Sequence, residues 1–290
     1  MKMIKIYLAI SILALAALAC NFDFNIPLTT DIKTGPTVTE EIDIPYWGDP
    51  SIPAEVTIGF GAGDLFISPG AADAAIQGEV TYNVEDLKPD ISINNETISL
   101  KTGSFELEGI PNFDEKIKNE WDLTIGSMET NLTIKAGAYN GEFELGGLSL
   151  ANLHIADGAA EVKVNFQEPN RIEMNSFRYE TGASDISLSN LSNANFNAFI
   201  FESGAGKYEL DFSGNLRRDS NVFITTGLSS MSIIVPRNMN VRLSLEGGLT
   251  NVSTRGSWDQ SGSYYIVEGE GPTLNITIEM NAGNLILKNP

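Results

Sequence analysis

The chain has 290 residues, with 38 acidic against 18 basic side chains and a formal net charge of −20 at pH 7. A charge of this sign argues against binding to nucleic acid and against electrostatic adhesion to anionic lipid. The single cysteine excludes a disulfide within the chain, and nothing in the sequence suggests a thiol or zinc site.

The first 20 residues form a predicted targeting segment. Lys2 and Lys5 provide a positive start, and the apolar stretch 6–19 is too short to span a bilayer comfortably as a helix. The sequence ALAC at 17–20 is similar to a bacterial lipobox, with the order of its first two residues exchanged. We therefore predict a lipoprotein signal peptide, lipidation of Cys20, and an extracytoplasmic location anchored to a bacterial membrane. Ordinary signal cleavage beside an incidental cysteine is the alternative.

Residues 21–45 mix Thr, Pro, Asp and Glu without a sustained hydrophobic period. Such a composition is typical of a linker, so this segment is predicted to be a flexible spacer between the membrane and the folded part. No second long apolar run follows Cys20, and the exported part is expected to be soluble and tethered by its N-terminus.

One template recurs along the rest of the chain: apolar, x, apolar, x, x, Gly, x, x, polar, apolar, x, apolar. Its clear copies are centred on Gly61, Gly158, Gly182, Gly204, Gly227 and Gly248, and the last copy has Asn281 in place of the glycine. A copy centred on Gly137 is disturbed in its second half by Gly141, and one centred on Gly103 matches less well. Successive centres from Gly137 to Gly248 lie 21 to 24 residues apart.

Each copy is interpreted as strand, corner and strand. Apolar residues two apart place their side chains on one face of a strand, and a glycine permits positive φ and a sharp bend. Because one copy cannot bury its apolar face alone, the copies must stack to form a continuous core. The sequence thus predicts an all-β fold, a single-stranded β-solenoid with coils of about 21–24 residues. A sandwich of meandering strands is the rival fold.

A family resemblance supports this interpretation. The stretch 56–91 resembles the N-terminal toast-rack domain of bacterial envelope proteins through its GAGDL corner, TYN strand and LKP turn, and NEWDLTI at 119–125 adds to the likeness. Residues 131–254 are similar to the adjoining repeat region of the putative-adhesin and envelope-stress-response solenoid families. The resemblance implies a toast-rack-like β domain at 46–130, continuous with a β-solenoid repeat region at 131–290.

The same resemblance implies a β-solenoid on the cell surface with no assigned catalytic residues. The chain departs from the family in having Cys20 as its expected anchor instead of a transmembrane helix. Direct signalling across the membrane is therefore not carried over from the family.

The GFGAG stretch at 59–63 is the first candidate for a ligand site, because glycines spaced in this way let backbone amides approach a phosphate. No helix is expected after it, since DLFIS continues as a second strand, and the same corner recurs along the chain. We interpret the glycines as a bend, and no cofactor is predicted.

The polar position of the template is the second candidate. In consecutive copies it is filled by Glu161, Asp185, Lys207, Ser230 and Asn251. Stacked carboxylates offer oxygen ligands of the kind that Ca²⁺ prefers. A lysine directly after an aspartate instead favours a solvated edge with lateral ion pairs. No metal site is predicted, and calcium binding at the acidic surface stays open.

His154 is the only histidine, and it lies between Leu153 and Ile155, which point inward in the template register. It is therefore expected to be an exposed histidine on the outer side of a strand. A Ser–His–Asp device would need a nucleophile and an acid within hydrogen-bond reach. Carboxylate pairs serve glycoside-cleaving enzymes, but with 38 acidic residues proximity alone has no diagnostic value. No catalytic residue is predicted.

The longer step to Asn281 implies an insertion, for which 257–265 is the candidate, and it carries Trp258, Tyr264 and Tyr265. Aromatic faces on a surface loop can stack on sugar rings or contact a protein partner. Terminal coils also need a cover, so these side chains can instead fold down as a cap. They form the candidate ligand-contact loop, with the capping role as the alternative.

These features predict a lipid-anchored binding, adhesion or structural module at the cell envelope. Its expected partners are the membrane, through the N-terminal lipid, and a polysaccharide or protein of the envelope. A carbohydrate-active enzyme on a β-helix and an envelope-stress component acting through a membrane partner are the alternatives.

Overall fold

The computed structural model describes residues 34–290 except 47, 50, 72–73 and 104–116, and all described residues fall in one compact unit of the chain. The predicted signal peptide and Cys20 lie outside the described residues. The elements are β1 (Val38–Pro45), β2 (Ala54–Ala71), β3 (Ala74–Tyr82), η1 (Glu85–Leu87), β4 (Pro89–Asn94), β5 (Thr97–Thr102), β6 (Asn119–Gly126), β7 (Glu129–Glu144), β8 (Ser149–Asn165), β9 (Met174–Ser189), η2 (Leu191–Ala194), β10 (Phe196–Asp211), β11 (Ser220–Ile234), β12 (Met239–Gly256), β13 (Asp259–Ser261), β14 (Tyr264–Val267) and β15 (Glu270–Asn289).

The all-β prediction is confirmed for the described residues, whose two helices are single short 3-10 turns. Among these residues no helix has the length and apolar character needed to cross a membrane. The strands join in one mixed sheet in the order β1-β3-β6-β2-β7-β8-β9-β10-β11-β15-β12-β14-β13, with β5 beside β2 and β4 beside β5.

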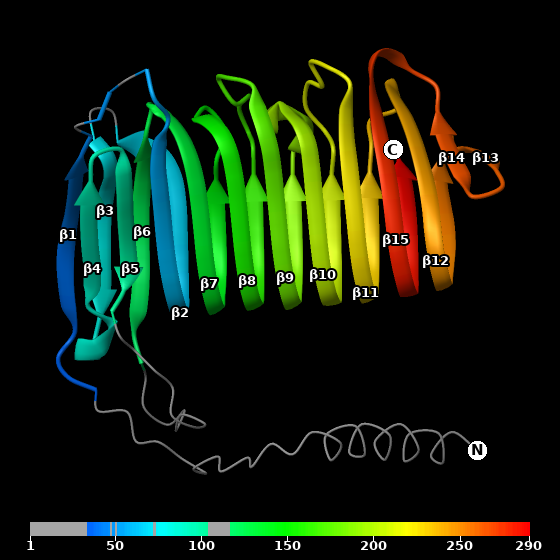
Figure 1. Cartoon of the computed structure of the whole chain (residues 1–290). Helices are drawn as coiled ribbons and strands as arrows, with labels where there is room; N and C mark the ends of the chain where they lie inside the picture. The colour runs from blue at the N-terminus through cyan, green and yellow to red at the C-terminus, as the bar shows by residue number, and fades with distance from the viewer. Residues whose placement is uncertain (1–33, 47, 50, 72–73, 104–116) are drawn as a thin grey trace, which may run out of the picture. The chain divides into compact units, whose positions relative to one another are not determined.

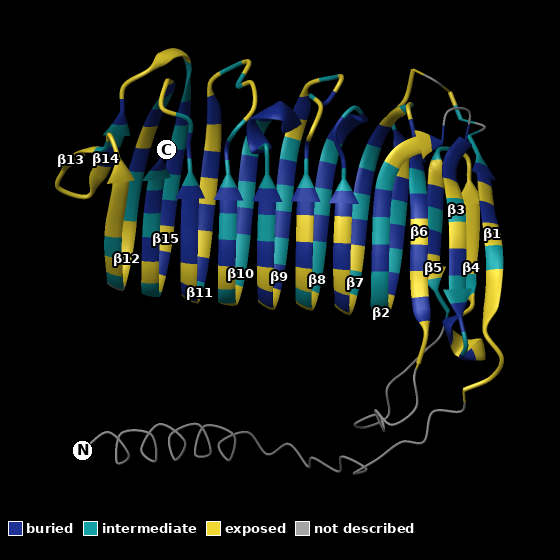
Figure 2. Cartoon of the chain, turned by 180° about the vertical axis from the view of Figure 1, so that it is seen from behind, coloured by how far each residue is buried: buried dark blue, intermediate teal, exposed yellow. Residues whose placement is uncertain are grey.

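The centre of the fold is a row of long parallel strands, from β2 through β7–β11 and β15 to β12, paired in constant register. In Figure 1 each long strand descends, bends at its lower end and returns behind itself. Every strand therefore has a first limb before the bend and a second limb after it. Buried and more exposed residues alternate along both limbs, as Figure 2 shows.

Apolar residues at equivalent template positions stack on one another inside the row. The first inward column consists of Val56, Leu132, Leu153, Phe177, Phe199, Val222, Ile276 and Leu243, each at most 1% exposed. The rings of Phe177 and Phe199 approach to 4.7 Å between centroids. Close packing of this kind gives a core that no single strand could bury by itself.

The template glycines are required because neighbouring strands approach each other closely there. The sequence had suggested a different reason, namely positive φ at these glycines. Positive φ occurs nearby instead, at Gly63 and Gly206. A Cβ built on Gly182 would lie only 2.4 Å from the carbonyl oxygen of Gly158, and one on Gly204 only 2.6 Å from that of Gly182. The strand also continues through the bend, so each copy is one bent strand and not two strands joined by a corner.

In the copy centred on Gly137, neighbouring side chains fill the space left by Gly141. The rings of Tyr139 and Phe143 stack at 6.3 Å and occupy the space beside this glycine, where an added Cβ would lie 2.8 and 3.1 Å from them. Both rings are buried. Two aromatic side chains thus fill the gap that the missing apolar side chain leaves in the inward column.

The order of the last strands differs from the order of the copies in the sequence. β15 lies between β11 and β12 and is parallel to both. The reason lies in their second limbs: Leu285 and Leu287 of β15 are fully buried, whereas Val252 of β12 is half-buried and Thr254 is exposed. An apolar limb needs a neighbour on each side, and the more polar limb is suited to the end of the row.

The predicted spacer 21–45 is wrong for its last residues, because 38–45 form β1 and pair antiparallel with β3. Ile42 and Ile44 are buried, and their spacing of two is a strand signal too short to stand out in a polar segment. The proposed boundary at residue 130 also falls inside β7, so no break in the fold separates the two predicted regions.

The glycine column predicts the effect of a single added methyl group. Gly182→Ala should lower the free energy of unfolding by about 1–3 kcal/mol, because the new Cβ overlaps the Gly158 carbonyl oxygen of the adjacent strand. Ala183→Val, at the next and exposed position, is the control and should change stability little. Urea unfolding of both variants checks this, and equal stabilities would contradict the close-approach explanation.

Candidate functional site

A continuous row of side chains crosses the outer side of the first limbs. Register pairs join its members one strand at a time, and we call it the outer row: Thr57, Thr133, His154, Arg178, Ile200, Phe223, Thr277, Ser244 and Tyr264. Because strands place alternate residues on opposite faces, this row lies outside the core columns. It carries two exposed aromatic residues, Phe223 at 49% and Tyr264 at 58%.

The outer row ends at a recess beside the β13–β14 hairpin. The hairpin recess has a volume of about 510 Å³, and its polar and aromatic lining consists of Asn240, Arg242, Ser244, Tyr264, Glu268, Asn275 and Thr277. These residues come from β12, β14 and β15, except Glu268, which directly follows β14. β14 pairs antiparallel with the start of β12 and thereby extends the outer surface beyond the last long strand.

The three aromatic residues of the predicted ligand-contact loop have different positions. Tyr265 is 5% exposed, lies opposite Leu243 and accepts a hydrogen bond from Gln260 Nε2 at 3.1 Å, so it covers the end of the core. Tyr264 points to the other side and lines the hairpin recess. Trp258 is half-buried and does not line this recess. Ligand contact by these side chains stays a prediction.

Several polar groups of the hairpin recess have no strong partner of their own. The Asn240 amide donates to the Thr273 hydroxyl at 2.8 Å, which orients one wall. Among the described residues, by contrast, neither Arg242 nor Glu268 forms an ion pair. Arg242 offers a planar set of N–H donors and Glu268 offers acceptors, so the recess presents both kinds of hydrogen-bonding group.

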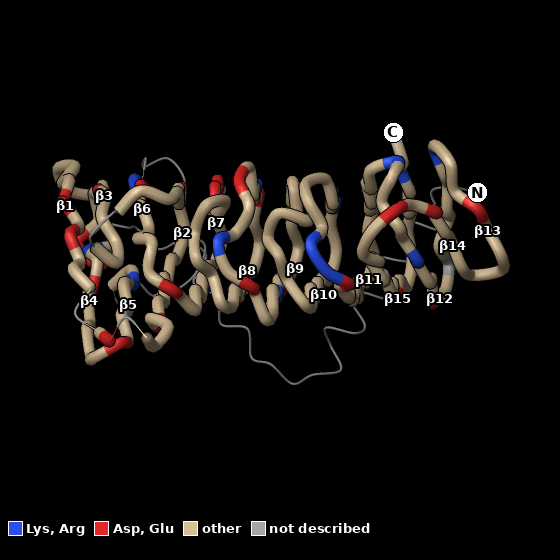
Figure 3. Tube along the Cα trace, turned by 90° about the horizontal axis from the view of Figure 1, so that it is seen from above, with Lys and Arg blue, Asp and Glu red and all other residues tan. Residues whose placement is uncertain are grey.

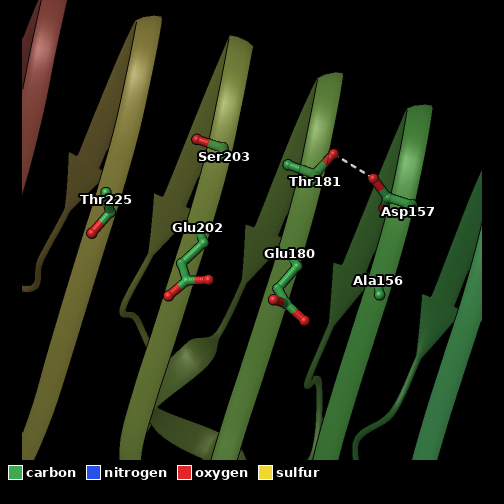
Figure 4. Close-up of a pocket in the computed structure, with 7 residues that line it drawn as sticks. All are labelled: Ala156, Asp157, Glu180, Thr181, Glu202, Ser203 and Thr225. Carbon is green, nitrogen blue, oxygen red and sulfur yellow. Dashed lines mark hydrogen bonds between the residues drawn. The ribbon is translucent and has the colours of Figure 1, made fainter.

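A second, shallower depression lies near the middle of the row. This carboxylate cleft, of about 640 Å³, is lined by Ala156, Asp157, Glu180, Thr181, Glu202, Ser203 and Thr225 (Figure 4). Arg178 Nη2 lies 2.9 Å from Glu180 Oε1 and 2.7 Å from Glu202 Oε2, and therefore bridges the two carboxylates.

His154 contacts the same cluster. Its Nε2 lies 2.5 Å from Glu180 Oε2. The imidazole lies on the outer side of β8, as expected, but is only 34% exposed. The Arg178 guanidinium, with a further contribution from His154, lowers the pKa of Glu180 to about 2. The glutamate is thereby held as an anion between two partners, which suits an ion-pair network.

Asp157 is held by hydroxyl groups at the inner side of the cleft. Thr181 Oγ1 donates to Oδ1, Tyr179 donates to Oδ2 at 2.8 Å, and Tyr139 donates to the same oxygen at 3.4 Å. Burial raises the pKa of Asp157 above its usual value, although these hydrogen bonds oppose the shift. Burial also raises the pKa of Tyr179 and of Tyr139.

The hydroxyl cluster continues along the bend as a polar seam through the core. Ser203 donates to Thr226 at 2.8 Å, and Thr226 donates to Ser229 at 3.0 Å. The sequence template did not predict this seam. Its signal is the residue directly before the template glycine, which is polar in four consecutive copies: Asp157, Thr181, Ser203 and Thr226.

The predicted polar column lies at the outer edge of the bend. Lys207 Nζ lies 3.2 Å from Asp185 Oδ2, which confirms the expected lateral ion pair. Asn251 is separated from Ser230 by Asn284 because β15 lies between their strands. Within the described residues, no group of three or more His, Cys, Asp or Glu side chains is arranged to hold a metal ion.

The remaining early candidate is the GFGAG stretch. Residues 59–63 lie inside β2, and the strand continues through them as expected for a bend.

Seen from the loop end of the row in Figure 3, acidic residues occur along its whole length and basic residues are fewer.

Asp157 predicts a measurable pH dependence. Because its folded-state pKa is raised above 3.8, its contribution to stability is fully present below that pH and declines as the pH rises through the folded-state value. Asp157→Asn cannot titrate, so the wild-type stability relative to this variant should fall as the pH is raised from about 4 toward neutral. Urea unfolding across this range checks the sign. A difference that grows with pH would mean that the hydroxyl groups, and not burial, dominate.

Comparison with solved structures finds similar chains with low sequence identity. A putative cell adhesion protein from Clostridium sporogenes is 17% identical, with 88% of this chain and 100% of that chain covered and a TM-score of 0.48. A putative adhesin from Bacteroides fragilis is 12% identical, with coverage of 89% and 99% and a TM-score of 0.46. A putative lipid binding protein from Parabacteroides distasonis is also 12% identical, with the same coverage and a TM-score of 0.39. Similarity at this level supports no conclusion about function.

No curated protein matches the chain. A family model does match: residues 33–176 fit the N-terminal domain of toast_rack, also described as DUF2154. The match begins at residue 33 and ends at the start of β9. It therefore covers the whole predicted toast-rack-like domain, 46–130, and the first part of the predicted repeat region, 131–290. Through residues 33–176, the chain belongs to the toast-rack family.

Proposed function

We propose that this protein is a lipid-anchored, extracytoplasmic β-solenoid that serves as a binding or adhesion module at the cell envelope. The bent, parallel strands β2, β7–β11, β15 and β12 are its coils, and the antiparallel strands at either end close the stack. The N-terminal segment ending at Cys20, which the sequence analysis predicts to be a lipoprotein signal, supplies the anchor.

The observation that carries the binding role is the hairpin recess. It combines an exposed aromatic ring, Tyr264, with the Arg242 guanidinium and the Glu268 carboxylate, which have no ion-pair partner among the described residues. Groups that are already exposed and unpaired lose little when a ligand replaces water around them. The recess also lies at the end of the stack where β14 pairs with β12, the last long strand.

The carboxylate cleft supports binding less well and catalysis hardly at all. A glycoside-cleaving pair needs one carboxyl group that holds a proton and one that is free to act as base or nucleophile. Glu180 and Glu202 are instead both bound by Arg178, and the pKa of Glu180 is lowered to about 2. Asp157 is occupied by tyrosine and threonine hydroxyls. These contacts favour a non-catalytic role.

The anchor predicts a specific labelling result. Wild-type cells grown with radiolabelled palmitate should yield labelled protein in the membrane fraction. Cys20→Ala should be unlabelled and should leave that fraction, because the chain then lacks the thiol that carries the lipid. A Cys20→Ala protein that stays membrane-bound, together with an unlabelled wild type, would exclude the lipid anchor.

The recess predicts a binding result. Full-length protein immobilised on beads should retain fragments of bacterial cell envelope, and Arg242→Ala should retain several-fold less because a charge-assisted hydrogen bond is lost. Arg237→Ala, which removes an exposed arginine outside the recess, is the matched control and should bind as the wild type does. Wild-type beads that retain no more than blank beads would refute the proposed function.

A further inference from the structure

We propose that the hairpin recess and the adjoining part of the outer row bind an extended, neutral glycan chain that lies across the strands. Tyr264 and Phe223 are the two platforms on which its sugar rings stack. The proposal rests on the proposed function as a binding module and names the ligand class and a second contact region.

The length of the ligand follows from the placement of the two aromatic rings. Tyr264 pairs in register with Ser244, Ser244 with Thr277, and Thr277 with Phe223. The two aromatic residues therefore lie in one row, three strands apart, which at about 4.8 Å per strand is roughly 14 Å. Each is about half exposed, at 58% and 49%, on a strand whose inward residues are buried. A ligand that covers both rings must be extended.

The surface between the two rings is polar. Ser244 and Thr277 are small hydroxyl residues whose oxygens are 3.3 Å apart, so they form a low, polar floor. Arg242 and Asn275 are register partners and form the adjacent row along one side of that floor. Planar groups with several donors or acceptors can bind neighbouring sugar hydroxyls in pairs, while the aromatic rings contact the apolar faces of the sugars.

The charges of this region disfavour an anionic ligand. Arg242 and Glu268 contribute one charge of each sign to the hairpin recess, and the row on the other side of the floor holds the exposed Glu246 and Glu279. The chain as a whole carries a net charge of −20, which repels polyanions at a distance. A neutral glycan fits both conditions better than an acidic polysaccharide.

A peptide ligand fits this surface less well. Extended peptides bind β-proteins by adding a strand to a free edge, where backbone groups are available. The recess and outer row lie on the face of the sheet, and the backbone of β12 in this region already pairs with β15 on one side and β14 on the other. Recognition here must therefore come from side chains, and these are hydroxyl, guanidinium, carboxylate, amide and aromatic groups.

The test uses full-length protein on an array of neutral glycans, followed by calorimetric titration with oligosaccharides of increasing length. Affinity should rise with chain length until the ligand reaches both rings. Tyr264→Ala should weaken binding of short and long chains by about tenfold, since one ring contact is lost from the recess. Phe223→Ala should weaken binding of the long chains by a similar factor and leave the short chains unchanged.

Leu228→Ala is the matched control, because this side chain is 64% exposed on the same strand as Phe223 but lies beyond the glycine bend. It should bind all chains as the wild type does. Since the three substituted side chains are exposed, circular dichroism and thermal unfolding should show folded proteins, which ties any loss to binding.

The possible failures are distinct. Retention of envelope fragments without any glycan binding would overturn the glycan proposal and leave the binding module in place, and displacement of these fragments by peptides would do the same. Loss of short-chain binding in Phe223→Ala, or an equal loss in Leu228→Ala, would overturn the placement across the strands. Failure to bind envelope fragments at all would remove the proposed function itself.

Discussion

The contact on which the structure depends is the close approach of backbone to backbone at the bend of each long strand. The carbonyl oxygen of one template glycine occupies the place where a Cβ of the next would be, from Gly61 through Gly137 and Gly158 to Gly227. A glycine leaves room for this contact without displacing the neighbouring backbone, so the glycine column from Gly61 to Gly227 holds these strands at the same height. The last copy has Asn281 at this position. Constant register on both limbs follows, because each strand is positioned at its bend.

Constant register turns a repeat in the sequence into rows across the surface. Every template position becomes a column, so a substitution in one copy lies directly beside its equivalents in the adjacent strands. Inward columns become a continuous core, and outward columns bring together residues that are more than 20 positions apart, such as Asp185 and Lys207. The same rule joins Tyr264 to Phe223, although β12 and β13 lie between them in the sequence.

The template allowed the core to be predicted well, because alternation within a strand and one glycine per copy are local signals. Leu153 and Ile155, which the template register placed inward, are buried. Three features of the fold were not predicted, each for a physical reason. The position of β15 depends on which limb can tolerate an open edge, a comparison between distant segments. β1 is too short to show a period, and the polar seam occupies positions that the template left unspecified.

The candidate site was predictable only in part, for the same reason. The aromatic residues of the insertion were visible in the sequence, but Tyr264 and Tyr265 are neighbours whose roles differ because β14 pairs with β12 and sends alternate side chains to opposite faces. Arg242 and Asn275 come together only because β15 inserts beside β12. Had β12 followed β11 directly, Asn221 would occupy that place and the recess would border different strands. The strand order at the end of the stack therefore determines both how the core is closed and which side chains line the hairpin recess.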